Sequence, residues 1–323
     1  MSARRTAARC RRLGAAAALG GMAAALVVPD RLRLDHRFPG VDVVAWRPHT
    51  TAATLAAAAF LATRRRSRPG AALVGAVGLG GAAAVAGRAI TRRAPEQGPE
   101  DLRILSLNAL HGRADTGELA TVIEREVPDF VVLPEAGCDF RDKLLPLVEV
   151  LGYRAWTSTE PGVRDGHSVT LLAGGRAGDV RVRIGTGMRY PHLEVTGGIL
   201  GRRTLYAVHP TAPMGPRRTA LWRKDLALIA QWCRAPIAPI VAGDFNSTLD
   251  HSVFRAAMAG CRSAAAGSGQ GLVATYPSAL PRWLGIQIDH VLVPPRTVTT
   301  RFDVVDVAGT DHRAVLAGVR LGS

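Results

Sequence analysis

The sequence P-I-V-A-G-D-F-N at residues 239–246 joins a short apolar run to a pair of polar side chains. The run 239–243 is apolar and bounded by proline and glycine, which predicts a buried β-strand. Asp244 and Asn246 follow it directly. The end of a strand is rigid yet open to solvent, so it can aim a polar side chain into a cleft. This stretch therefore predicts a sheet with a polar site at its edge.

The same arrangement recurs throughout residues 101–323. Further strands are predicted at 103–108, 130–133, 168–173, 204–209, 288–293 and 314–319, and helices at 116–126 and 217–232. Polar residues lie at or just beyond the ends of these runs: Asn108, Glu135, His209, Asp289, Asp311 and His312. We therefore expect one site built from several separate segments of the chain.

These residues supply two kinds of chemistry. Asn108, Glu135 and Asp311 are hard oxygen donors, which suit Mg²⁺ or Mn²⁺ better than Zn²⁺. The other candidates can handle water and phosphate: His209, Asp244, Asn246 and His312. Hydrolysis of a phosphoester needs charge neutralised on the phosphate oxygens and a water aimed in line with the bond that breaks. The residues together predict a metal-dependent phosphoesterase.

Six short motifs, in order, resemble those of the endonuclease/exonuclease/phosphatase superfamily over about 220 residues. They are Ser106-Leu107-Asn108, Leu133-Pro134-Glu135, Ala207-Val208-His209-Pro210, Gly243-Asp244-Phe245-Asn246, Ile288-Asp289-His290 and Thr310-Asp311-His312-Arg313. Each residue alone has an ordinary structural explanation, such as an Asx-turn at Asp244. The complete ordered set favours a catalytic site. The resemblance implies an α/β fold, a two-sheet α/β sandwich with outer helices and a site at one end of the sheets.

The resemblance also implies a role for each residue on the phosphate side. Asn108 and Glu135 would bind the metal, and Asp311 would complete the network of metal and water. His209 would contact the scissile phosphate, and Asn246 would help to hold it.

The remaining residues would act on water and on charge. Asp244 would orient or deprotonate the attacking water. Asp289 would accept a hydrogen bond from His312, and His312 would stabilise the negative charge that develops at phosphorus. His167 departs from the usual pattern of such families, and we interpret it as a rim residue rather than a substrate contact.

Arginine and lysine recur at the start of the helix after His209, at positions 217, 218, 223 and 224. The favoured interpretation is a solvated basic face. The alternative is a grip on a polyanionic substrate such as a pyrophosphate.

Residues 1–100 differ in composition from the rest of the chain. They contain 16 Arg and 5 acidic residues, against 25 Lys and Arg and 21 acidic residues in 101–323, so the net charge of +15 divides into +11 and +4. Positive and negative charges nearly balance in 101–323, which argues against a surface that binds the phosphate backbone of a nucleic acid. We therefore expect no stable nucleic-acid partner.

Three apolar stretches give residues 1–90 the character of a membrane region. The candidate transmembrane spans are 13–29, 44–63 and 70–88, followed by a linker at 91–100 and the catalytic domain at 101–323. All are short or marginal for a bilayer. The first could instead be a signal peptide, and all three could be an Ala-rich soluble segment.

Arginine clusters predict the orientation of these spans. Dense clusters precede the first stretch and separate the second from the third, at residues 4–12 and 64–68. The positive-inside rule places both in the cytoplasm. With three spans, we expect a multi-pass protein of the cell (plasma) membrane with an extracytoplasmic catalytic domain. If the second stretch does not span, the catalytic domain lies in the cytoplasm.

The four cysteines fit no zinc-binding spacing. Cys10 stands among arginines, and Cys138, Cys233 and Cys261 allow at most one disulfide among themselves. We interpret them mostly as buried thiols.

A membrane anchor favours a substrate that lies in the bilayer, because anchoring confines the enzyme to the same plane. Ala-rich spans before such a domain resemble actinobacterial membrane proteins linked to teicoplanin resistance. That resemblance implies hydrolysis of a lipid-linked (pyro)phosphate, such as a cell-wall polyprenyl pyrophosphate, at the outer face. Two alternatives remain: a membrane-tethered endonuclease or general phosphodiesterase, and a catalytically inactive binding module.

Overall fold

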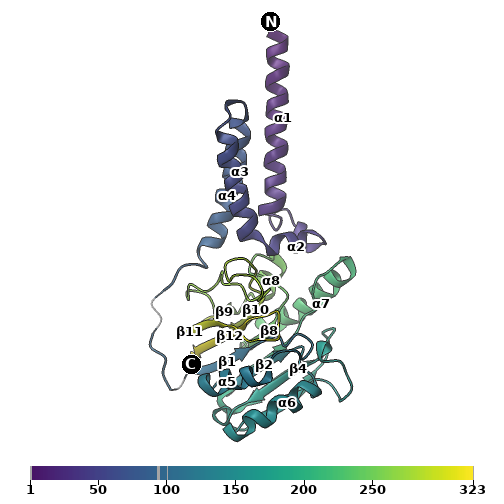
Figure 1. Ribbon diagram of the computed structural model, residues 1–323, viewed down its shortest axis with the longest axis vertical. Helices are drawn as coiled ribbons and strands as arrows, with labels where there is room; N and C mark the ends of the chain where they lie inside the picture. The colour runs from purple at the N-terminus through teal and green to yellow at the C-terminus, as the bar shows by residue number, and fades with distance from the viewer. Residues whose placement is uncertain (1, 93–94, 100, 323) are drawn as a thin grey trace.

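The computed structural model describes residues 2–92, 95–99 and 101–322, and it has two parts (Figure 1). An α/β body formed by residues 101–322 carries both sheets. A helical extension stands off one side of that body. It contains α1 (Ser2–Val27), α3 (Arg47–Ala62) and α4 (Arg68–Ala86).

The first sheet has six strands with a parallel pair at its centre. In order across the sheet, they are β11 (Val298–Val305), β12 (Ala314–Arg320), β1 (Leu102–Ser106), β2 (Phe130–Pro134), β4 (Val169–Ala173) and β3 (Arg154–Thr157). Strands β1 and β2 are parallel, and β12 runs antiparallel to β1. The carboxyl ends of β1 and β2 therefore lie beside the amino end of β12.

The second sheet repeats this plan. In order, its strands are β5 (Val180–Gly185), β6 (His192–Gly197), β7 (Thr204–Val208), β8 (Ile240–Asp244), β10 (Asp289–Val293) and β9 (Arg262–Ser263). Strands β7 and β8 are parallel, and β10 runs antiparallel to β8. The register pairs Asp289 with Asp244 at the edge where β8 ends and β10 begins.

The two sheets face each other across the main hydrophobic core. Alternate residues of the strands point into it, among them Ile104 and Val132 from the first sheet and Ala242 and Val291 from the second. On the outer faces lie α5 (Thr116–Glu126) and α6 (Cys138–Val148) on one side, and α7 (Pro216–Cys233) and α8 (Ser252–Ala257) on the other. The predicted two-sheet α/β sandwich with outer helices is confirmed.

Two helices of the extension are long and apolar enough to cross a membrane, by length and composition alone. They correspond to Arg9–Val27 and Arg65–Ala86, and only 17% and 28% of their most apolar windows are buried. A core helix of a soluble protein would be mostly buried. The middle helix, α3, has 16 residues and does not reach the same length. The prediction of three spans is therefore not confirmed: two helices pass this test of length and composition, and the third does not.

Small residues allow the three helices to approach one another closely. Gly81 of α4 lies against Val27 of α1 and Thr51 of α3, and a side chain at this position would overlap both. The chain runs toward the body in α1, away from it in α3 and back toward it in α4 (Figure 1). The start of α1 and the turn between α3 and α4 consequently both lie at the end far from the body. The arginine-rich segments of the sequence both lie toward that end, and α1 extends beyond the turn between α3 and α4 (Figure 1).

The segment between α1 and α3 packs directly on the body. It includes the short helix α2 (Gly40–Ala45), and Val41 is fully buried in the cluster beneath α7 and α8. Arg47 is 3% exposed and donates to the Val27 carbonyl and the Asp250 carboxylate, each at 2.9 Å, and it pairs with Asp30. Extension and body are thus joined by a buried polar network as well as by the chain between them.

One pair of cysteines differs from its expected state. Cys233 at the end of α7 forms a disulfide with Cys261, with the two Cα atoms 5.5 Å apart. The interpretation as buried thiols is wrong for this pair, because α8 and the loop after it return the chain to the end of α7. Cys138 is a free, buried thiol as expected.

Candidate active site

The eight residues singled out from the sequence meet at one end of the two sheets, around a pocket of about 620 Å³. Those that line it are Glu135, His209, Asp244, Asn246, Asp311 and His312. Asn108 and Asp289 are buried directly behind them and bond to lining residues. These residues converge because of the strand directions. In each sheet, the two parallel strands end at this edge and the neighbouring antiparallel strand begins there.

A buried ion pair forms the back of the pocket. The Nδ1 atom of His312 lies 2.9 Å from a carboxylate oxygen of Asp289. Burial by itself lowers the pKa of His312, but the charge and hydrogen bond of Asp289 outweigh it and raise the pKa to about 10. His312 is therefore an imidazolium at neutral pH. Its Nε2 atom faces the oxygens of Asp311 at 3.8 Å and Asp244 at 3.9 Å.

Asp244 is a buried carboxylate held from two sides. One oxygen accepts the backbone N–H of Asn246 at 2.8 Å, and the other accepts the side-chain amide of Asn108 at 3.0 Å. Burial, and next the charge of Asp289, raise the pKa of Asp244 to about 7. A carboxylate with a pKa near neutrality can both take and return a proton.

The preceding glycine makes this placement possible. Gly243 has φ of 149°, and a side chain there would overlap the carbonyl oxygen of Val208 on the neighbouring strand β7. Without a side chain at this position, β8 approaches β7 closely and delivers Asp244 at the sheet edge. The Gly-Asp pair at the end of β8 is thus a structural requirement of the site.

Asn108 bridges two carboxylates. Its amide nitrogen donates to Glu135 at 3.2 Å as well as to Asp244, and its side-chain oxygen accepts the backbone N–H of Leu110 at 2.9 Å. The side-chain oxygen that would ligate a metal accepts this one hydrogen bond and keeps a second lone pair. The structure therefore places Asn108 as a bridge between carboxylates, and its assignment as a metal ligand remains a prediction.

His111 belongs to the site although nothing in the sequence marks it. Its backbone N–H and its Nδ1 atom both lie 3.0 Å from the same oxygen of Glu135. The backbone here is unusual, since Leu110, His111, Glu135 and Asn246 all have φ between 48° and 57°. Side chains other than glycine rarely adopt such values, and these conformations concentrate at functional sites.

Stacked rings form one side of the pocket. Tyr190 stacks on His209 with ring centroids 5.7 Å apart, and His167 stacks on the other side of Tyr190 at 4.9 Å. Burial lowers the pKa of His209, with the charge of Glu135 opposing the shift, and its buried Nδ1 atom has no hydrogen-bond partner in the part of the chain that the structure describes. A neutral imidazole at this position can hydrogen-bond a phosphate oxygen. His167, interpreted as a rim residue, lines the pocket as the outer member of the stack.

The charges around the pocket fit a divalent cation. Four carboxylates converge here: Glu135, Asp244, Asp289 and Asp311. Buried oxygens of Asp289 and Asp311 have no partner among the described residues. Hard oxygen donors in such number match Mg²⁺ or Mn²⁺.

One group of possible ligand atoms lies especially close together. Atoms of Asp244, Asp289 and His312 are within 4.8 Å of one another. His312 and Asp289 are, however, bonded to each other through Nδ1 and a carboxylate oxygen. The carboxylates that line the pocket and could hold a cation there are Glu135, Asp244 and Asp311, and the unpartnered oxygen of Asp289 lies behind them.

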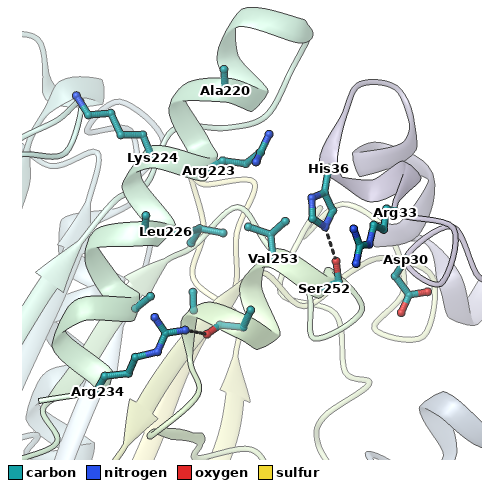
Figure 2. Close-up of a pocket in the computed structure, with 14 residues that line it drawn as sticks. Asp30, Arg33, His36, Ala220, Arg223, Lys224, Leu226, Arg234, Ser252 and Val253 are labelled. Carbon is teal, nitrogen blue, oxygen red and sulfur yellow. Dashed lines mark hydrogen bonds between the residues drawn. The ribbon is translucent and has the colours of Figure 1, made fainter.

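A second hollow, of about 720 Å³, lies between α7, α8 and the loop after α1 (Figure 2). Its basic lining residues are Arg33, His36, Arg223, Lys224 and Arg234. In Figure 2, Arg223 extends toward the side where His36 lies, whereas Lys224 points the other way. Of the four basic residues at the start of α7, Arg218 lines the catalytic pocket, and Arg223 and Lys224 line this other hollow. If α7 contacts the substrate, the residue that does so is therefore Arg218.

A two-sheet α/β sandwich with a carboxylate and histidine pocket at the strand ends defines a phosphoesterase-type protein. The model of the endonuclease/exonuclease/phosphatase family matches residues 105–312. The chain belongs to this family, whose members are hydrolases that act on phosphoesters and generally use divalent metals.

Solved structures support the same fold. A humanised TDP2 of D. rerio aligns with a TM-score of 0.51 at 17% identity, covering 69% of this chain and 100% of that chain. An endonuclease/exonuclease/phosphatase from Bacteroides vulgatus gives 0.53 at 13%, covering 69% and 99%. One from Beutenbergia cavernae gives 0.51 at 20%, covering 69% and 72%. No curated protein matches the sequence significantly. At these identities the likeness shows the fold alone.

Proposed function

We propose that this chain is a membrane-anchored, divalent-metal-dependent phosphoesterase that hydrolyses a lipid-linked (pyro)phosphate at the outer face of the membrane. One observation carries the proposal. The pocket that holds the Asp289–His312 pair and Asp244 lies on a body docked against the base of three apolar helices. A cell-wall polyprenyl pyrophosphate is the kind of substrate that such a placement suits, in keeping with the resemblance to proteins linked to teicoplanin resistance.

The residues divide the chemistry among themselves. Asp244 takes a proton from the attacking water, whose oxygen bonds to phosphorus while the bond to the leaving oxygen breaks. His312 places positive charge beside the phosphate oxygens as negative charge develops there. His209 and Asn246 hold the phosphate by hydrogen bonds. A divalent cation, which Glu135 and Asp311 would hold, would supply further charge neutralisation.

The helical extension supports a membrane location. If α1 and α4 cross a bilayer, α3 crosses too, because it is the helix that carries the chain from the body side back to the far side. The arginine-rich end then lies in the cytoplasm by the positive-inside rule, and the body lies outside. The Cys233–Cys261 disulfide agrees with that side, since disulfides persist in oxidising compartments.

A membrane-tethered nuclease or general phosphodiesterase is the second candidate. A TDP2 structure of the same fold is complexed with a single-strand DNA product. Against this stands the weak net charge of +4 on residues 101–323, since nucleic-acid binding depends on clustered cations. An inactive binding module has little support, because it would not need the buried Asp289–His312 pair facing Asp244.

The test uses the full chain purified in detergent with Mg²⁺. Phosphate release from a long-chain polyprenyl pyrophosphate is measured beside nicking of supercoiled plasmid DNA, with Asp244→Asn as the inactive control. We expect phosphate release by the wild type alone. Strong nicking without phosphate release would establish the nuclease instead. If Asp244→Asn keeps the activity of the wild type, the reaction does not take place in this pocket.

A further inference from the structure

The catalytic pocket has a wall that comes from outside the catalytic domain. Val41, Asp42 and Ala45 of α2, together with Trp46, line the same pocket as Asp244 and His312. The family match begins at residue 105. This wall, residues 41–46, is therefore an addition of this chain to the family domain.

The wall is held firmly against the body. Val41 is fully buried in the cluster formed with Trp222 and Phe254, and its carbonyl oxygen accepts the Nε2–H of His251 at 3.0 Å. The Nδ1 atom of the same imidazole accepts the backbone N–H of Thr248 at 3.0 Å, which fixes the neutral tautomer. The position of residues 41–46 beside the phosphate site is thus a packed feature of the fold.

Polar links on both flanks of α2 reinforce this position. On the N-terminal side, the backbone N–H of Ser252 donates to Asp35 at 2.6 Å. On the C-terminal side, Arg47 and Arg88 both pair with the buried Asp250. The wall cannot swing away from the pocket without breaking these buried bonds, each of which is expensive to leave unmade.

The chemistry of the pocket changes with distance from the phosphate site. Around Asp244 the lining is carboxylate and imidazole. On the wall, the apolar surface open to the pocket is the half-buried indole of Trp46, since Val41 has no exposed surface and Ala45 is only 8% exposed. The loop before α7 adds Ala212, Pro213 and Met214, whose side chain is 70% exposed. The pocket is thus polar around Asp244 and apolar on the side next to the helical extension. This distribution matches a molecule with a phosphate at one end and a hydrocarbon chain at the other.

We infer that residues 41–46 bind the first carbons of the substrate's hydrocarbon chain and so select amphiphilic phosphoesters. The inference rests on the proposed function and names the feature that distinguishes its substrate. The phosphate lies at Asp244 and His312, and the chain runs along Trp46 toward the apolar helices. The exposed carboxylate of Asp42 on the same wall disfavours a nucleic-acid backbone at this position.

The experiment compares two substrates that differ only in the length of the chain. The full protein in detergent hydrolyses a long-chain polyprenyl pyrophosphate or dimethylallyl pyrophosphate, and kcat and KM are measured for both. Trp46→Ala should lower the ratio of kcat/KM for the long substrate over the short one about tenfold, mainly through KM, because an apolar contact binds ground state and transition state alike. Trp46→Phe, which keeps an aromatic ring, should restore most of the ratio.

Trp283→Ala is the matched control, because Trp283 is 75% exposed and is not among the residues that line the pocket. It should leave the ratio unchanged. If Trp46→Ala lowers both substrates equally, or neither, the wall is a structural clamp and the inference is overturned. The inference also fails if the wild type hydrolyses the short substrate as well as the long one. Absence of wild-type hydrolysis of either substrate would overturn the proposed function itself.

Discussion

Replacing Asp289 by asparagine should expose how strongly His312 depends on its partner. The substitution keeps the shape of the side chain but removes the charge that lies 2.9 Å from Nδ1. Burial lowers the pKa of His312, and Asp289 is the main influence that raises it to about 10. Without that charge, we expect the pKa to fall by roughly 2 or more. Asp244 and Asp311 remain and raise it less.

The same pair links stability to pH. A histidine whose folded pKa is raised stabilises the fold fully below its unfolded pKa, and this contribution is lost as the pH rises through the folded value. For His312 the window runs from about 6.5 to about 10. A difference of this size is on the order of 5 kcal/mol. The wild type should therefore lose stability across this window, and Asp289→Asn, whose folded pKa lies closer to the unfolded value, should lose roughly half as much or less.

Imidazole titration by NMR gives the direct readout. The full chain is labelled with ¹⁵N-histidine and held with a chelator, so that no cation alters the field at the site. The resonances of His312 are assigned by comparison with His312→Gln. A wild-type pKa near 6.5, or a pKa that Asp289→Asn leaves unchanged, would refute this reasoning.

Two further substitutions test how the body is held together. Cys233→Ser opens the disulfide that spans 28 residues and should lower the free energy of unfolding, measured by urea titration, by roughly 3–4 kcal/mol. Cys138→Ser, at a free thiol, should cause no such loss. Equal losses in both variants would contradict the presence of the disulfide. Arg47→Met breaks a buried ion pair and should lower the free energy of unfolding by roughly 3 kcal/mol. The loss should not be larger, because Asp250 retains Arg88 as a partner. The substitution should also expose the segment before α3 to proteases. Arg37→Met, at an exposed position of that segment, should do neither.

Much of the site could be predicted from local pattern. Asp244, Glu135 and His209 each lie at or just beyond the end of an apolar run that forms a central strand, and a buried strand delivers the residues at its end to the sheet edge. The edge strand β5 gave no such signal, because Arg181 and Arg183 interrupt its apolar residues and face solvent. Its pairing with β6 depends on contacts made only in the folded chain.

Other features depend on distances that no pattern records. Cys233 and Cys261 come within bonding reach only because α8 returns the chain to α7. The orientation of Asn108 follows from two carboxylates that arrive from other strands. The sequence also did not predict that Trp46 lines the pocket. Its segment was interpreted as the start of an apolar span, but it packs beside the catalytic residues.

We propose that six separate segments build one cation-dependent, phosphoester-cleaving pocket. The most direct measurement is phosphate release by the full chain after chelation, after return of Mg²⁺, and in Asp244→Asn at equal folded concentration. The account predicts activity that vanishes with the chelator, returns with Mg²⁺ and falls by a factor of about 10³ or more in the variant. Activity that survives the chelator and the substitution together would contradict it.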